Sequence, residues 1–176
     1  MTDRKTERSA VKWYVAYTRT CQERRAAEIL SGLGIESYVP IQKEVRQWSD
    51  RRKVVDKLVI PHIIFLHCDD YKRDWILRNI PQIPRCMAQQ RDPFEPAFVP
   101  DDQMETFRRF VECGSYKVNI SSEPLEAGDT VRVVSGPLAG CECELMKVSD
   151  QRLLVTRLPL LGAAVVEIGR ETVEKI

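Results

Sequence analysis

The C-terminal part of this 176-residue chain is interrupted by glycine and proline too often to fold as helices. The interruptions are Gly136, Pro137, Gly140, Pro159, Gly162 and Gly169. An interior proline costs a helix about 3 kcal/mol and a glycine about 1 kcal/mol. The segments between them, such as Leu153 to Thr156 and Ala163 to Ile168, are short and rich in Val, Leu and Ile, which suits strands. We therefore predict that residues 125–176 form a small β-barrel and not a helical hairpin.

The preceding residues alternate between strand and helix patterns. We expect strands at 13–17, 35–41, 58–68 and 85–89, with a kink or an edge at Pro61 in the third. We expect helices after a capping box of Thr20 and Glu23, after Asp70 as the cap, and around Met104, Phe107, Phe110 and Val111. The order β-α-β-β-α-β plus a helix predicts an α+β fold, in which a ferredoxin-like antiparallel sheet with helices precedes the β-barrel.

Changes in composition along the chain suggest four segments. Polar residues predict a disordered leader at 1–11 and a linker at 115–124, on either side of a first domain at 12–114. The β-barrel domain would then cover 125–176. Within the first domain, the basic stretch from Lys43 to Lys57 predicts a hairpin or a loop tip.

Charge and cysteine usage exclude several classes of protein. The net charge is +1, made of +4 over residues 1–120 and −3 over residues 121–176, so only the front part is a candidate for meeting a polyanion. The chain has no apolar run of the roughly 18 residues that a membrane span needs, which predicts no membrane-spanning segment. The residues after Met1 include no apolar region, which predicts no signal peptide, and together these features predict a cytoplasmic protein. The six cysteines are scattered and indicate no disulfide framework.

The histidines and cysteines show no pattern typical of a metal site or of catalysis. His62 and His67 would point to opposite faces of one strand, and Cys141-x-Cys143 lacks the second pair of a zinc site. A Cys/His nucleophile pair stays open, but no motif supports it. We predict no catalytic residue, no metal and no cofactor.

Two groups of motifs resemble one family. Gly128 to Gly140, with Val131 and Val133 alternating along a strand, resembles the KOW motif of NusG proteins and of some ribosomal proteins. Its loop would be formed by Gly136, Pro137, Leu138 and Gly140. The segments Trp13–Tyr17, Tyr38–Pro40 and Val59–Leu66 resemble strands of the NusG N-terminal (NGN) domain. The chain is thus similar, over residues 12–176, to transcription elongation factors of the NusG type.

The resemblance implies a docking function for the first domain. In the family, this domain covers the clamp helices of RNA polymerase with an apolar depression and suppresses pausing. The matching residues here are Tyr17, Ile60, Ile63 and Phe65. The alternative is that all four residues belong to the core of the sheet. For Phe65 this alternative and the docking role are equally good interpretations. We expect Tyr17 and Ile63 to be interface residues, with Ile63 only part-buried in the free protein.

The resemblance also implies a contact with the non-template DNA strand near the first strand and helix. Arg19, Arg24 and Arg25 lie there and could bind phosphate or stack on a base. The alternative is a solvated helix face with an Arg24–Glu28 pair. Basic residues around Trp48, namely Arg46, Arg51, Arg52 and Lys53, could touch upstream DNA or form a solvated loop.

The acidic second domain favours a protein partner over nucleic acid. The resemblance implies NusE, a ribosomal protein, or the termination factor Rho as that partner, with the chain itself a monomer. Two residues depart from the housekeeping pattern, since His62 and Cys143 stand where it has glycine. A cysteine is tolerated there only if its φ is negative. Both departures resemble the specialised RfaH and UpxY types, which act on capsule or surface-polysaccharide operons. The competing interpretation is a ribosome-associated or RNA-binding KOW protein.

Overall fold

The computed structural model describes residues 10–123, 125–169 and 171–176. The predicted disordered leader at 1–11 lies, except for its last two residues, outside this described part. The described residues divide into two compact units. The first unit contains the residues up to Val39 and His62–Val99, and the second contains Pro40–Pro61 and Pro100–Ile176. These units interleave along the chain, whereas the predicted domains follow one another.

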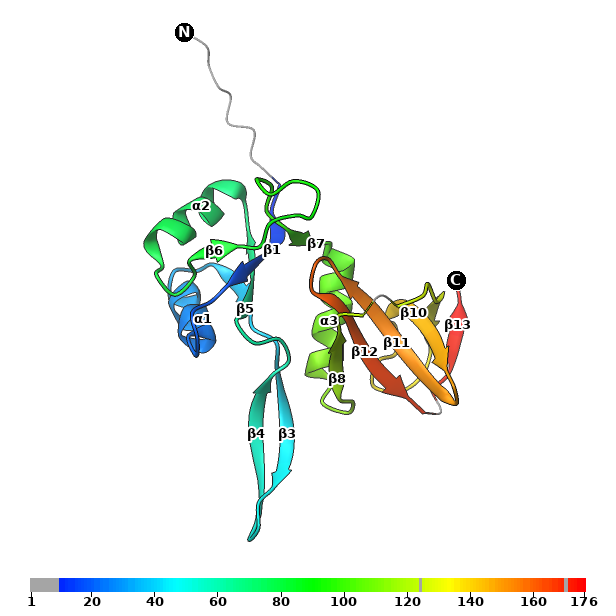
Figure 1. Ribbon diagram of the computed structural model, residues 1–176. Helices are drawn as coiled ribbons and strands as arrows, with labels where there is room; N and C mark the ends of the chain where they lie inside the picture. The colour runs from blue at the N-terminus through cyan, green and yellow to red at the C-terminus, as the bar shows by residue number, and fades with distance from the viewer. Residues whose placement is uncertain (1–9, 124, 170) are drawn as a thin grey trace. The chain divides into compact units, whose positions relative to one another are not determined.

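The first unit is a five-stranded antiparallel sheet with two helices (Figure 1). Its elements are β1 (Lys12–Tyr17), α1 (Glu23–Gly32), β2 (Glu36–Tyr38), β5 (Ile63–Cys68), α2 (Asp70–Asn79), β6 (Arg85–Cys86) and β7 (Phe98–Val99). The strand order is β2-β5-β1-β6, with β7 also paired to β1. This order is that of a ferredoxin-like fold, so the predicted fold class is confirmed.

One face of this sheet is the core that α1 and α2 cover. Tyr14, Ile64 and Leu66 point to it from β1 and β5, and Leu30 and Ile76 reach it from the two helices. All five are at most 1% exposed. The alternation of the strands sends Val15, Ile63 and Phe65 to the opposite face, where they are also buried.

Local details differ from the predictions around Pro61 and at the helix starts. The predicted strand 58–68 is two strands, because a bend at Val59 and Ile60 and a turn at Pro61 and His62 separate β4 from β5. The capping box of Thr20 and Glu23 is wrong: Gln22 is the N-cap of α1, without a side-chain cap bond. The cap of α2 is Asp69 instead of Asp70, and its carboxylate accepts the Lys72 N–H at 2.7 Å.

The second unit contains an antiparallel hairpin, a helix and a six-stranded antiparallel sheet. The hairpin is β3 (Ile41–Gln47) with β4 (Arg52–Leu58), and the helix is α3 (Asp101–Glu112). The sheet has the order β13-β9-β10-β11-β12-β8. Its strands are β8 (Val118–Ser121), β9 (Asp129–Val133), β10 (Glu142–Val148), β11 (Gln151–Leu158), β12 (Gly162–Ile168) and β13 (Val173–Lys175).

The C-terminal residues have the β structure that the glycines and prolines predict. Val131, Val133, Leu138, Leu154 and Val166 form a buried interior, each at most 2% exposed. The predicted linker is partly wrong, because β8 lies within it and pairs with β12. Among the described residues, none of the helices combines the length and the apolar character that a membrane crossing requires.

Candidate functional site

At the C-terminal end of β1, an aromatic residue lies between two neighbouring strands. Tyr17 pairs with Ile63 of β5 on one side and with Arg85 of β6 on the other. The Arg85 guanidinium lies over the Tyr17 ring, 4.7 Å from its centroid, which is cation–π geometry. Tyr17 is half-buried and Arg85 is exposed. This edge of the first unit therefore presents a cation stacked on an aromatic ring.

A buried carboxylate holds the turn beside Tyr17. The Glu23 Oε1 atom accepts the His62 backbone N–H at 2.9 Å and lies 3.6 Å from Nδ1 of the His62 ring. The Thr18 N–H in turn donates to the His62 carbonyl at 2.9 Å. Glu23 is 3% exposed, so it serves this turn from α1 instead of capping its own helix.

His62 has the backbone conformation that glycine favours. Its φ is 62°, in the left-handed region. This explains why the housekeeping pattern of the resembling family has glycine at this position. His62 is held in the same conformation by its hydrogen bonds with Glu23 and Thr18. The other departing residue is unstrained: Cys143 lies in β10 opposite Val131, and its φ is not positive.

The three predicted DNA-binding arginines all lie at this edge. Arg19, Arg24 and Arg25 are exposed on the β1–α1 loop and the first turn of α1. The Arg19 N–H donates to the Gln82 carbonyl at 2.9 Å, which ties the loop to the segment before β6. We call Tyr17, Arg19, Arg24, Arg25, His62 and Arg85 the β1–α1 surface.

The predicted docking residues are more buried than expected. Ile63 is 3% exposed and Phe65 is 0% exposed, so the expectation of a part-buried Ile63 is wrong. β5 lies between β1 and β2, and side chains on both of its faces are buried. Ile60, in the second unit, is 9% exposed. Only Tyr17 keeps substantial exposed surface.

The hairpin of the second unit carries the predicted basic tip. Trp48 is 57% exposed at the turn, where its N–H donates to the Arg51 carbonyl. Arg46 lies opposite Lys53 and pairs with Glu44 at 3.7 Å. Arg51, Arg52 and Lys53 are all exposed, so the hairpin end is a basic surface with one aromatic ring.

The predicted KOW loop, in the second unit, contains two glycines in the left-handed backbone region. Gly136 and Gly140 have φ values of 91° and 86°, and both they and Pro137 are exposed. Leu138 is 0% exposed and therefore anchors the loop in the sheet interior. Arg109 of α3 donates to the Ala139 carbonyl at 2.6 Å, so the helix contacts the loop directly.

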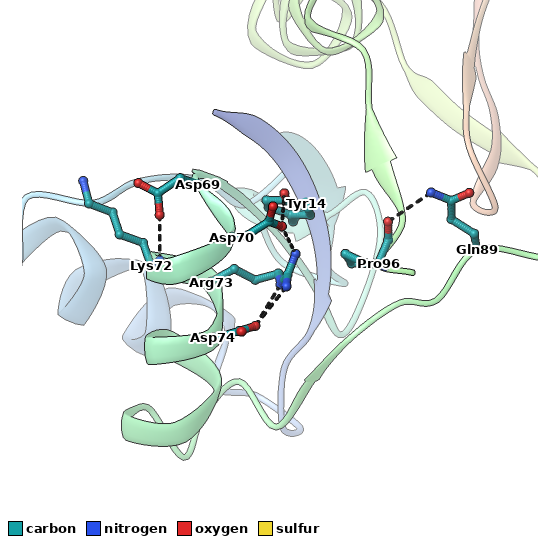
Figure 2. A network of polar contacts seen from close by, with 8 residues as sticks. All are labelled: Tyr14, Asp69, Asp70, Lys72, Arg73, Asp74, Gln89 and Pro96. Atoms are coloured by element: carbon teal, nitrogen blue, oxygen red, sulfur yellow. Dashed lines mark hydrogen bonds and ion pairs between the residues drawn. The ribbon is translucent and has the colours of Figure 1, made fainter. Parts of the chain in front are cut away.

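A polar network between β1 and α2 was not predicted from the sequence (Figure 2). The buried Tyr14 hydroxyl donates to Asp70 Oδ1 at 2.7 Å, and Arg73 pairs with both Asp70 and Asp74. The Arg73 guanidinium lies 4.8 Å from the Tyr14 ring centroid. Burial, together with the Asp70 bond, raises the pKa of Tyr14. The spacing of Asp70, Arg73 and Asp74 on one helix was the available signal.

Three comparisons identify relatives of the chain. The family described as "Transcription termination factor nusG" matches residues 11–108. Two curated proteins named "Transcription termination/antitermination protein NusG", from Streptomyces coelicolor and Streptomyces griseus, are each 24% identical over 184 aligned positions that cover 92% of this chain. The chain spans only 59% and 60% of the length of these two relatives.

A solved structure shares the fold. "Domain interaction in Thermotoga maritima NusG" aligns with a TM-score of 0.50 and 17% identity, and the alignment covers 95% of this chain and 98% of the other. At this identity the likeness concerns the fold alone. Because the family match covers more than half of the residues, the chain belongs to the NusG family.

Proposed function

We propose that the chain binds RNA polymerase and acts as a transcription elongation or antitermination factor. The family match over residues 11–108 carries this proposal. The two Streptomyces relatives are named for termination and antitermination, and we extend that activity to this chain. The clamp helices of the polymerase are the proposed docking site.

Of the four predicted docking residues, Tyr17 is half-buried and the other three are buried, so a partner would contact Tyr17 first. Its half-buried ring, stacked with Arg85, gives an apolar and cationic contact at the open end of β1. Ile60, Ile63 and Phe65 would contact a partner only after the groups that cover them move away.

The arginines of the β1–α1 surface are the proposed contacts with the non-template DNA strand. Exposed Arg19, Arg24 and Arg25 lie on one short segment, which suits a strand of phosphates, and the Arg85–Tyr17 pair offers a stacking surface for a base. The basic hairpin tip around Trp48 is a second candidate for upstream DNA.

The second unit would recruit a protein. Residues 121–176 carry a charge of −3, which opposes phosphate binding and is compatible with NusE or Rho as partner. We further propose a specialised role at capsule or surface-polysaccharide operons, because His62 and Cys143 replace glycine in the housekeeping pattern. Transcript mapping in a deletion strain tests this: loss of distal transcription in single operons supports it, and a genome-wide shift contradicts it.

The docking proposal is tested by pull-down with purified polymerase core and, separately, with ribosomal subunits. We expect binding to the polymerase and at least a tenfold loss in Tyr17→Ala, with the melting temperature of the variant as the folding control. Preferential binding to ribosomal subunits would favour the alternative KOW function and overturn the proposal.

The DNA proposal needs a separate experiment. Gel shifts of paused complexes with matched and scrambled non-template strands compare the Arg24→Ala, Arg25→Ala double variant with Arg78→Ala, an exposed arginine of α2. We expect the double variant to lose binding more on the matched strand, and the Arg78→Ala control to behave like the wild type. An equal loss of binding on the matched and the scrambled strand would mean that the two arginines contact phosphates and do not contribute to sequence selectivity.

A further inference from the structure

A groove in the first unit lies between α2 and the segment that follows β6. Its volume is about 240 Å³, and its apolar walls come from Leu77, Met87, Phe94 and Pro96. Figure 2 shows Arg73 and Asp74 extending from α2 and Pro96 on the facing segment. The volume lies below the roughly 300 Å³ at which small-molecule sites begin. The groove is therefore suited to one or two side chains and is too small for a cofactor.

One residue that lines the groove, Phe94, is exposed to solvent on the loop after β6. Phe94 is 94% exposed. Its N–H donates to Asp92 Oδ1 at 2.9 Å, and the Glu95 N–H donates to the Asp92 carbonyl at 3.2 Å. The Gln89 N–H closes the loop by donating to the Glu95 carbonyl at 2.8 Å. An ordered turn thus presents the ring beside the other apolar walls, where a partner can cover it.

The charged groups of the groove are mostly acidic. Asp74 on α2 and Glu95 on the loop are both exposed carboxylates of its lining. The one cation of the lining, Arg73, is already engaged by Asp70 and Asp74. The lining therefore combines an exposed aromatic ring, apolar walls and an excess of one negative charge, because Asp74 and Glu95 face one arginine.

We propose that this groove binds an arginine-bearing apolar segment of a partner protein. The arginine stem packs on Leu77 and Met87, while its guanidinium stacks on the Phe94 ring and pairs with Glu95. An arginine satisfies all three features of the groove at once, whereas an acidic or purely apolar segment satisfies one. This site is separate from the β1–α1 surface, so it stands whether or not the chain docks on polymerase as proposed.

The test uses the full-length, ¹⁵N-labelled chain titrated with a blocked hexapeptide of alternating arginine and leucine. We expect saturable chemical-shift changes at the amides of Leu77, Met87, Phe94 and Glu95. A peptide with glutamine in place of arginine should bind at least tenfold more weakly. Shifts confined to other acidic surfaces, such as the second unit, would overturn the proposal, as would equal binding of the glutamine peptide.

Single variants separate the groove from general charge effects. Phe94→Ala and Glu95→Gln should each weaken the arginine peptide at least fivefold without changing the melting temperature, because both side chains are exposed. Leu33→Ala removes an apolar side chain that is 51% exposed at the end of α1 and serves as the matched control. An affinity unchanged in both groove variants would refute the site.

Discussion

Replacing Ile63 by glutamate distinguishes a covered sheet residue from an open docking residue. Ile63 is 3% exposed, so its side chain contributes about 1.5–3 kcal/mol of burial that the substitution removes. A glutamate enclosed there would be neutral, and protonating a group of ordinary pKa about 4.3 at pH 7 costs about 3.7 kcal/mol. We expect Ile63→Glu to lower the free energy of unfolding by about 5–7 kcal/mol, which is comparable to the whole stability of many domains.

Urea unfolding followed by circular dichroism at pH 7 and pH 5 measures this effect. The loss should be smaller at pH 5, because protonating the carboxyl then costs less. Val45→Glu is the matched control: it lies on β3, is 64% exposed and should change stability by no more than about 0.5 kcal/mol. A loss below about 1.5 kcal/mol for Ile63→Glu, without pH dependence, would mean that Ile63 faces water and would restore the expectation of an open docking depression.

Three other predictions concern the turns and ties of the two units. Hydrogen bonds from Arg157 lower the pKa of Glu144, so the stability that this pair contributes is present above the ordinary carboxyl pKa and is lost as the pH falls. Glu144→Gln should therefore lower the free energy of unfolding by about 1 kcal/mol at pH 7 and by progressively less in acid, as measured by unfolding at a series of pH values. Glu23→Ala leaves the His62 N–H without its acceptor and should cost about 2–3 kcal/mol, whereas Glu23→Gln keeps an oxygen there and should cost less; similar losses for both would show that the hydrogen bond matters little. Leu138→Ala should cost about 2–5 kcal/mol in thermal unfolding, and a neutral result would place Leu138 outside the interior of the C-terminal sheet.

The sequence was sufficient where a property depends on near neighbours in the chain. Glycine and proline at fixed places exclude helices after residue 125, and the described residues there form strands. The alternation of Val131 and Val133 correctly predicts their buried face. The order of strand and helix patterns predicts the ferredoxin-like sheet, because short connections leave few topologies.

The errors occur where partners come from distant parts of the chain. The spacing of Thr20 and Glu23 is that of a capping box, but the Glu23 carboxylate finds a better donor in the His62 N–H, 39 residues away in the chain. The pattern of Val59 to Leu66 does not reveal that Pro61 and His62 form a turn, since the left-handed φ of His62 is held by bonds to distant residues: Glu23 accepts its N–H, and the Thr18 N–H donates to its carbonyl.

The candidate surfaces depend on tertiary structure for the same reason. An apolar strand such as β5 has two faces, and its sequence cannot tell whether one or both are covered. In the fold, side chains on both faces are buried, since every residue from Ile63 to Leu66 is buried. The cluster of Tyr17 with Arg85 and the groove between Leu77 and Phe94 also join segments far apart in the chain. Periodicity along a chain reports which side chains share a face, whereas contact across elements depends on how the whole sheet and its helices pack.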